Sequence, residues 1–217
     1  VVIISVGAGL SYGALGYSHH AVEDLSVMRA LRGLDIYSPG DPRELRQVMN
    51  KIFARRRPSY LRLSKEGADF GQSCDHADFP SGTVMLRGKP EKMVILSTGS
   101  IGTFAKHAVL KLDSSTRAVT SLYSVADFDG ISELVPKIKD SSAIVTVEEH
   151  NSDGGFGTHI LEVLSSAGHH VPLLRLGTKN GLRHAVGDHD YLRKAHGLDP
   201  DSISKAIMNF SRSVFRS

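Results

Sequence analysis

The stretch AIVTVEEHNSDGGFG, residues 143–157, decides the fold class of this 217-residue chain. Its first five residues, Ala143 to Val147, are all apolar or β-branched, which predicts a buried central strand of a parallel sheet. A glycine-rich loop at residues 154–157 follows, and then a helical pattern that runs to about Ser166. A strand, a loop and a helix in this order form the unit of open α/β sheets with right-handed crossovers.

The same alternation of strand and helix patterns extends outward over most of the chain. In the first part, strands are expected at residues 1–6, 34–38 and 59–63, and helices at residues 20–31 and 42–53, the latter capped by Asp41. Further strands are expected at residues 83–86, 93–98, 118–123 and 171–176, and helices at residues 100–112 (capped by Ser100), 131–139, 188–196 and 199–210. The sequence therefore predicts an α/β fold with two open sheets of mainly parallel strands and flanking helices.

The pattern divides the chain into two domains and a connection. We predict a first domain over residues 1–65, a linker over residues 66–82, where the periodicity is lost, and a second domain over residues 83–217. The opening run VVIISV, residues 1–6, predicts a buried strand that needs a neighbour on each side. The first domain is therefore expected to be incomplete at its N-terminus.

The composition is typical of a soluble globular protein. Hydrophobic residues make up 41% of the chain and charged residues 23%, which argues against a disordered chain. The net charge of +3 is too small to call for nucleic acid. No apolar run approaches the roughly 20 residues that a membrane helix needs. The single cysteine, Cys74, cannot form an internal disulfide, so we expect a cytoplasmic protein. From the charge and the apolar runs, we expect it to bind neither nucleic acid nor membrane.

Chemistry is expected in the loops that follow the strands. The glycines of GAGLSYG, residues 7–13, do not have the spacing of a dinucleotide-binding loop. His19 and His20 stand where that loop leads into a helix, and a neutral imidazole there could exchange a proton with a ligand. A purely structural role for His19 stays open at this point.

The loop after the central strand offers a second set of candidates. Glu148 and Glu149 could act as acid or base, although one of them is expected at the surface. The glycines at residues 154–157 could open an anion site at a helix start or allow close packing of helix on sheet, and packing is favoured. The polar residues His150, Asp188 and His189 show no ligand spacing, so no metal site is predicted in this chain.

Ten short motifs together carry a resemblance to a known family. In order they are GAGLSYG (7–13), SHH (18–20), EDL (23–25), MRAL (28–31), SPGDPRE (38–44), PSYLRLSK (58–65), VEEHN (147–151), GGFG (154–157), LRLG (174–177) and GLD (197–199). Their joint order and spacing resemble the transketolase family over nearly the whole chain. The second half also resembles the C-terminal domain of 1-deoxyxylulose-5-phosphate synthase and of the beta subunits of 2-oxoacid dehydrogenases.

The resemblance implies site residues and a cofactor. It implies thiamine diphosphate with a divalent metal, Mg²⁺, held mainly by another domain or subunit. His19 would be the catalytic residue and would also contact the aminopyrimidine ring of the cofactor, and His20 would contact sugar hydroxyls in place of the usual glutamine. Lys65 stands where the family often has an arginine that holds a substrate phosphate, and Arg62, which is expected to face the same side, would also bind the substrate. Leu15 replaces an acidic residue of many relatives, which puts one substrate contact in doubt.

The resemblance also implies a partner. The glutamate and the aromatic residue that contact the pyrimidine ring in the family, and its diphosphate-binding motif, have no counterpart in this sequence. We therefore expect the C-terminal subunit or part of a transketolase, which transfers a two-carbon ketol unit between sugar phosphates only with an N-terminal part, in a homo- or hetero-oligomer. The alternatives are a dehydrogenase beta subunit, a synthase of the kind named above, and a non-catalytic assembly module.

Overall fold

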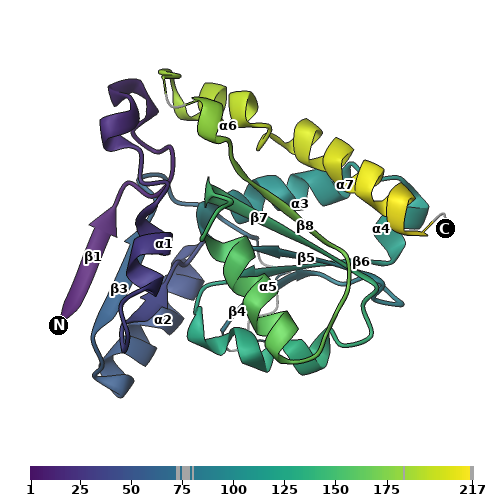
Figure 1. Cartoon of the computed structure of the whole chain (residues 1–217), viewed down its shortest axis with the longest axis horizontal. Helices are drawn as coiled ribbons and strands as arrows, with labels where there is room; N and C mark the ends of the chain where they lie inside the picture. The colour runs from purple at the N-terminus through teal and green to yellow at the C-terminus, as the bar shows by residue number, and fades with distance from the viewer. Residues whose placement is uncertain (72–73, 75–78, 80, 183, 216–217) are drawn as a thin grey trace.

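The computed structural model describes residues 1–71, 74, 79, 81–182 and 184–215 and shows two sheets side by side (Figure 1). The smaller sheet has the order β1-β3-β2 and the larger one the order β4-β6-β5-β7-β8. All neighbouring strands run parallel except β4, which is antiparallel to β6. The predicted fold class, two open and mainly parallel α/β sheets, is confirmed. We call the parts built on the two sheets the first unit and the second unit.

The first unit follows the predicted order of elements. Its strands and helices are β1 (Val2–Val6), α1 (Asp24–Arg29), β2 (Asp35–Tyr37), α2 (Pro42–Arg55) and β3 (Ser59–Leu63), with the 3-10 turns η1 (Gly13–Leu15) and η2 (Tyr17–His19) before α1. Asp41 is confirmed as the N-cap of α2, because its Oδ1 accepts hydrogen bonds from the N–H groups of Arg43 and Glu44 at 2.9 and 2.8 Å. The first helix is shorter than the expected residues 20–31, because α1 begins only at Asp24 and ends at Arg29.

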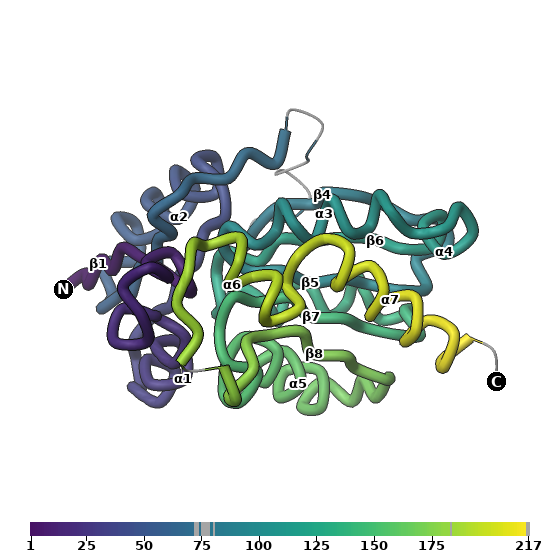
Figure 2. The backbone as a smooth tube through the Cα atoms, turned by 90° about the horizontal axis from the view of Figure 1, so that it is seen from above, coloured from purple at the N-terminus to yellow at the C-terminus, as the bar shows by residue number. Residues whose placement is uncertain are grey.

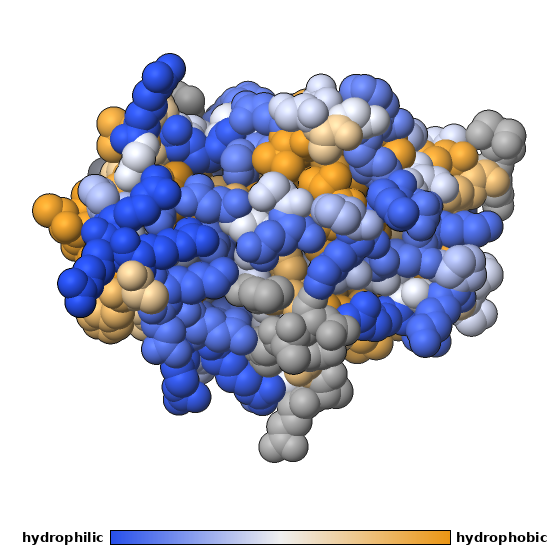
Figure 3. Space-filling view, turned by 90° about the horizontal axis from the view of Figure 1, so that it is seen from below, coloured by the Kyte–Doolittle hydropathy of each residue, from blue (hydrophilic) through white to orange (hydrophobic). Residues whose placement is uncertain are grey.

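Strand β1 lies at an edge, contrary to the prediction that it is buried between two neighbours. Among the described strands it pairs only with β3. Val2, Ile3, Ile4 and Val6 are between 42% and 57% exposed, as is expected for an apolar strand with a free edge. In Figure 3, apolar side chains reach the surface at the end of the molecule where β1 lies, whereas most of that face is hydrophilic.

The second unit is a three-layer arrangement. Its elements are β4 (Gly82–Leu86), β5 (Met93–Ser97), η3 (Gly99–Ile101), α3 (Gly102–Leu110), α4 (Ser114–Ala118), β6 (Thr120–Val125), η4 (Asp129–Glu133), η5 (Val135–Lys137), β7 (Ala143–Asn151), α5 (Phe156–Ser166), β8 (Leu173–Thr178), η6 (Asn180–Leu182), α6 (His189–His196) and α7 (Pro200–Phe215). Figure 1 shows α3 and α7 on one side of the sheet and α5 on the other. Of the helices that the structure describes, none combines the length and hydropathy required to cross a bilayer.

Two expected helices of this unit differ from the structure. Ser100 does not cap α3, because the 3-10 turn η3 precedes that helix and no side chain caps it. The region of residues 131–139 forms the 3-10 turns η4 and η5 rather than an α-helix. Pro136, in η5, has no N–H to donate and opposes a continuous α-helical ladder there.

The core joins the two units. Side chains alternate along the strands, so Val94 and Leu96 face the α5 side and Met93 and Ile95 face α3 and α7. The cluster on the α5 side also includes Leu25, Ile36 and Tyr60 of the first unit. The two units therefore share one hydrophobic core, and they lie end to end in Figure 2.

The predicted linker is only partly described. Residues 72–73, 75–78 and 80 lie outside the described residues, and β4 begins at Gly82, the last residue assigned to the linker. Phe70, Cys74 and Phe79 are buried, the first two against the α3 side of the sheet and Phe79 in the core shared by both units. The described part of this segment thus packs on the second unit rather than spanning solvent.

Candidate functional site

The candidate site is built on the loop that follows β1, residues 7–20. This loop begins at the carboxyl end of β1, where the N–H groups of Gly7 and Ala8 donate to the carbonyl of Leu63 at the end of β3, each at 2.9 Å. Its far end is closed by reciprocal backbone bonds between Gly9 and Ala21, at 3.0 and 2.9 Å. The loop is therefore held at both ends, and its tip carries the histidines predicted as site residues.

His19 lies at the end of η2 and is exposed to solvent. Its Nδ1 lies 3.0 Å from the hydroxyl of Ser18, within hydrogen-bond distance. Because the ring is exposed, a ligand can reach it directly.

His20 points the other way and is half-buried. Its ring packs edge-on against Tyr17, with the centroids 6.1 Å apart. It lines a small cavity of about 20 Å³ together with Leu10 and His196, enough for one water molecule. The buried Nε2 of His20 has no hydrogen-bond partner within the described chain. Such an atom is suited to bind a hydroxyl group of a ligand.

Lys65 follows β3 and is exposed. Its Nζ lies 5.2 Å from the ring centroid of Tyr12, a cation–π distance. The hydroxyl of the preceding Ser64 lies 3.2 Å from that of Ser11. Both contacts are with the loop of residues 7–20, so the structure brings Lys65 against the loop that carries His19.

Arg62 is placed differently from the expectation. It is 3% exposed, donates from Nε to Asp24 at 2.8 Å, and donates from Nη2 to the carbonyls of Ala21 and Glu149 at 2.7 and 3.2 Å. Burial lowers its pKa, but the charge of Asp24 outweighs burial and holds the pKa above its usual range. The expectation that Arg62 and Lys65 face the same side is wrong, because β3 ends at Leu63 and Arg62 points into the contact between the units.

Glu149 is the residue that holds the loop in place. It is buried at the end of β7 and accepts hydrogen bonds from the N–H of Leu10 at 2.7 Å, from Nε2 of His189 at 2.5 Å and from Nε of Arg193 at 2.8 Å. Burial raises its pKa, but the hydrogen bond from His189 and the charge of Arg193 outweigh burial and lower the pKa to about 2. One ionised carboxylate thus ties the loop of the first unit to β7 and α6 of the second.

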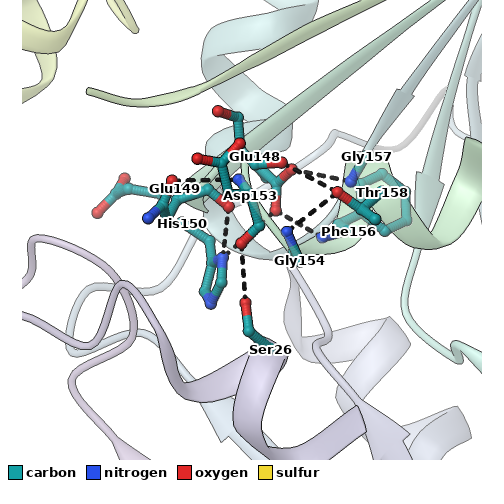
Figure 4. A network of polar contacts seen from close by, with 12 residues as sticks. Ser26, Glu148, Glu149, His150, Asp153, Gly154, Phe156, Gly157 and Thr158 are labelled. Carbon is teal, nitrogen blue, oxygen red and sulfur yellow. Dashed lines mark hydrogen bonds and ion pairs between the residues drawn. The ribbon is translucent and has the colours of Figure 1, made fainter. Parts of the chain in front are cut away.

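The neighbouring Glu148 closes the start of α5. Its two carboxylate oxygens accept hydrogen bonds from the N–H groups of Phe156 at 2.6 Å and Gly157 at 2.8 Å, as Figure 4 shows. Burial outweighs these bonds and raises the pKa of Glu148 to about 7. Because this carboxylate occupies the helix start, the glycines serve close packing, as favoured from the sequence. The expectation that one of the two glutamates is at the surface is wrong.

His150 completes a buried polar layer between the units. Its Nδ1 donates to the carbonyl of Asn151 at 2.8 Å, and its Nε2 lies 3.7 Å from the carboxylate of Asp24. Burial, followed by the charge of Arg62, lowers its pKa to about 4, so the ring is neutral at physiological pH. In the described part of the chain, no group of three His, Cys, Asp or Glu side chains is arranged to hold a metal ion.

Sequence reasoning missed the structural roles of these residues. Glu149 was named only as a possible acid or base, and His150 and His189 showed no ligand spacing, because the partners are distant in sequence: Leu10 is 139 positions from Glu149. The two adjacent acidic residues at the end of a strand were the only available signal.

Comparison with known proteins places this geometry in a family. Residues 1–69 match the profile "Transketolase, pyrimidine binding domain", and residues 82–203 match "Transketolase, C-terminal domain". The chain is 32% identical over 206 residues to one subunit of an apulose-4-phosphate transketolase from Actinobacillus succinogenes, an alignment that covers 94% of this chain and 65% of the relative. It is 31% identical over 210 residues to a 1-deoxy-D-xylulose-5-phosphate synthase of Dechloromonas aromatica, covering 95% of this chain and 33% of that enzyme.

A solved structure agrees with this assignment. The chain resembles "Split gene transketolase, inactive beta4 tetramer" with a TM-score of 0.77 and 26% identity, over 96% of this chain and 65% of that one. The chain therefore spans about two thirds or less of the length of these relatives.

Proposed function

The chain belongs to the transketolase family, and from this premise we propose that it is the C-terminal part of a thiamine-diphosphate-dependent transketolase. The reaction moves a two-carbon ketol unit from a donor to an acceptor sugar phosphate. The observation that carries the proposal is the match of two transketolase domains, in order, over residues 1–69 and 82–203. The exposed His19, on the loop that Glu149 holds, supports it.

The described residues suit part of a cofactor site. The exposed imidazole of His19 and the unpartnered Nε2 of His20 can contact polar groups of the cofactor or the sugar. No metal-binding group occurs among the described residues, so we propose that another domain or subunit holds the diphosphate and its Mg²⁺. When bound, the cofactor supplies an electron sink for breaking and forming the carbon–carbon bond.

We assign roles to four residues of this chain. His19 exchanges a proton with a hydroxyl of the sugar, with the Ser18 hydroxyl within hydrogen-bond distance of its ring. His20 contacts a sugar hydroxyl through its buried Nε2. Lys65, a flexible point charge against the loop, holds the substrate phosphate. Arg62 acts as a positioning residue, because its hydrogen bonds to the carbonyls of Ala21 and Glu149 link the end of the loop to β7. With a single buried cysteine, Cys74, we place the protein in a reducing compartment, the cytoplasm.

The test is reconstitution. The chain is mixed with the N-terminal transketolase polypeptide of the same source, and ketol transfer between sugar phosphates is measured with thiamine diphosphate and Mg²⁺. Activity is expected in the mixture and not in either component alone. No activity and no cofactor binding in the mixture would contradict the proposal and favour an assembly module. Pyruvate-dependent dye reduction faster than ketol transfer would instead indicate a dehydrogenase beta subunit.

A further inference from the structure

The second unit contains a cavity that the proposed reaction does not use. It has a volume of about 500 Å³ and lies between the end of β8 and the start of α7, elements that Figure 2 shows in the second unit. The polar side chains that define it are Arg175, Lys179, Asn180, Ser202, Lys205 and Asn209. This volume is within the range of sites for small molecules.

The cavity is lined by positive charge from three separate elements. Arg175 comes from β8, Lys179 from the turn after β8, and Lys205 from α7. Among the described residues that line the cavity, none is acidic. Neither Lys179 nor Lys205 forms an ion pair in the described part of the chain. Positive side chains that line one cavity without an acidic side chain among them favour the binding of an anion.

The contacts of Arg175 and the position of Lys179 are defined by the structure. Arg175 donates from Nη1 to the carbonyl of Ser152 and to the hydroxyl of Thr158, both at 2.8 Å, which fixes its guanidinium at the wall. Lys179 extends over the turn between α6 and α7, where a Cβ on Gly197 would lie 3.5 Å from its Nζ.

The start of α7 does not itself supply the anion site. Asp199 accepts hydrogen bonds from the N–H groups of Asp201 and Ser202, each at 3.1 Å, so those donors are satisfied. Asp201 is paired with Lys111, away from the cavity lining. The available groups are therefore side chains: two lysines, the guanidinium, and the hydroxyl and amides beside them.

We propose that this cavity binds a small ligand that carries a phosphate or diphosphate group, at a site separate from the substrate-phosphate site of Lys65. A phosphate offers three oxygens and about two negative charges, which suits a cavity lined by three cations and several neutral donors. The proposal does not rest on the proposed reaction, because no residue of the cavity is assigned to it.

The test is titration of the purified protein with sodium pyrophosphate at low ionic strength, without Mg²⁺, by isothermal calorimetry. The variant Lys179→Gln/Lys205→Gln removes two cations. The charge-matched control Lys139→Gln/Lys194→Gln removes two exposed lysines that do not line the cavity. A third protein, Lys65→Gln, removes the proposed substrate-phosphate contact. Melting temperatures confirm that each variant is folded.

Saturable binding is expected in the parent, the control and Lys65→Gln, and binding at least about tenfold weaker in the cavity variant, as two lost charge-assisted contacts require. Added NaCl is expected to weaken the binding that remains. No saturable binding by the parent, equal binding by the cavity variant, or a loss confined to Lys65→Gln would each overturn the proposal. None of these readouts depends on ketol transfer.

Discussion

Glu149 is not one of the residues proposed to contact the ligand, yet its hydrogen bonds determine where the loop that carries His19 lies. Its carboxylate is buried, and each of its three hydrogen-bond donors comes from a segment far away in sequence. A buried charge is tolerated only when it is paired and fully hydrogen-bonded. Here the pairing requires that the loop of residues 7–20 and helix α6 close on the same strand end.

Replacing Glu149 by glutamine is expected to lower the free energy of unfolding by about 3–5 kcal/mol at pH 7, because it removes the buried counter-charge of Arg193, whose other ion pair, with Asp190 at 3.6 Å, is to an exposed carboxylate. Urea unfolding measures the change. Glu162→Gln is the matched control, since its carboxylate is 57% exposed and its loss is expected to cost under about 1 kcal/mol. Equal effects of the two substitutions would contradict the role of Glu149.

The stability difference between the parent and Glu149→Gln is expected to depend on pH, with a sign that follows from the pKa of Glu149. The pKa of Glu149 falls from an ordinary value of 4.5 to about 2 on folding, so its contribution to stability is complete above pH 4.5 and is lost as the pH falls towards 2. The stability difference between the parent and Glu149→Gln is therefore expected to shrink between pH 4.5 and pH 2. A difference that stays constant over this range would show that the carboxylate is not ionised at neutral pH.

His19→Ala tests the proton-transfer role in the reconstituted enzyme. Loss of a positioned acid–base group is expected to lower kcat by about 10²-fold or more. The side chain is exposed, so the melting temperature is expected to stay unchanged. His107→Ala, which removes another exposed histidine, serves as the control. An unchanged kcat would remove His19 from the mechanism.

Lys65→Ala tests the phosphate contact. The KM for phosphorylated sugars is expected to rise about tenfold, because a charge-assisted contact with the phosphate is lost. The KM for unphosphorylated sugars is expected to stay the same. Lys139→Ala provides an exposed control lysine. If KM rose equally for both kinds of sugar, the contact with phosphate would be wrong.

At the scale of elements, the turn from β7 into α5 is tightly constrained. A Cβ at Gly155 would lie 2.5 Å from Nδ1 of His150 and 2.6 Å from the carbonyl oxygen of Asn151, and would also clash with the Glu148 carboxylate. Strand, carboxylate and helix start are thus packed too closely for any side chain at this position.

Gly155→Ala is accordingly expected to lower the free energy of unfolding by about 1–3 kcal/mol, the usual cost of overpacking. Gly67→Ala is the control, because a Cβ there has no neighbour within 4 Å. Chemical denaturation compares the two. A Gly155→Ala protein as stable as the control would mean that the backbone of the turn moves apart at little cost.

The elements also show how far sequence reasoning reaches. Local signals worked: the apolar run of β7 and the Asp41 cap depend on neighbours within a few residues. The prediction failed where two local geometries compete. Residues 131–139 have a helical pattern, but the chain around Pro136 forms 3-10 turns. The site was predicted only by resemblance, because the contacts that build it, such as Leu10 with Glu149, join segments without any shared period.

At the scale of the whole molecule, the two units are joined by directed hydrogen bonds as well as by a shared core. Asn151 N–H donates to the carbonyl of Val22 at 2.8 Å, and Arg29 donates to the carbonyl of Gly154 at 2.6 Å. Ser26 donates to the carbonyl of Asp153 at 3.1 Å, which Figure 4 shows between α1 and the loop after β7. These polar contacts and the shared core hold the loop of His19 against the second unit.

This contact makes the peptide connection between the units dispensable. A site-specific protease sequence inserted after the exposed Gly67 would allow the folded chain to be cut there. The two pieces are expected to co-elute on size exclusion and to melt in one transition, because the bonds of Glu149 and the common core remain. Pieces that separate would show that covalent tethering, not packing, holds them. If they stay together, the gene of an enzyme of this kind can be split at more than one position. The position of the split can then change in evolution while the surface that carries the proposed site stays intact.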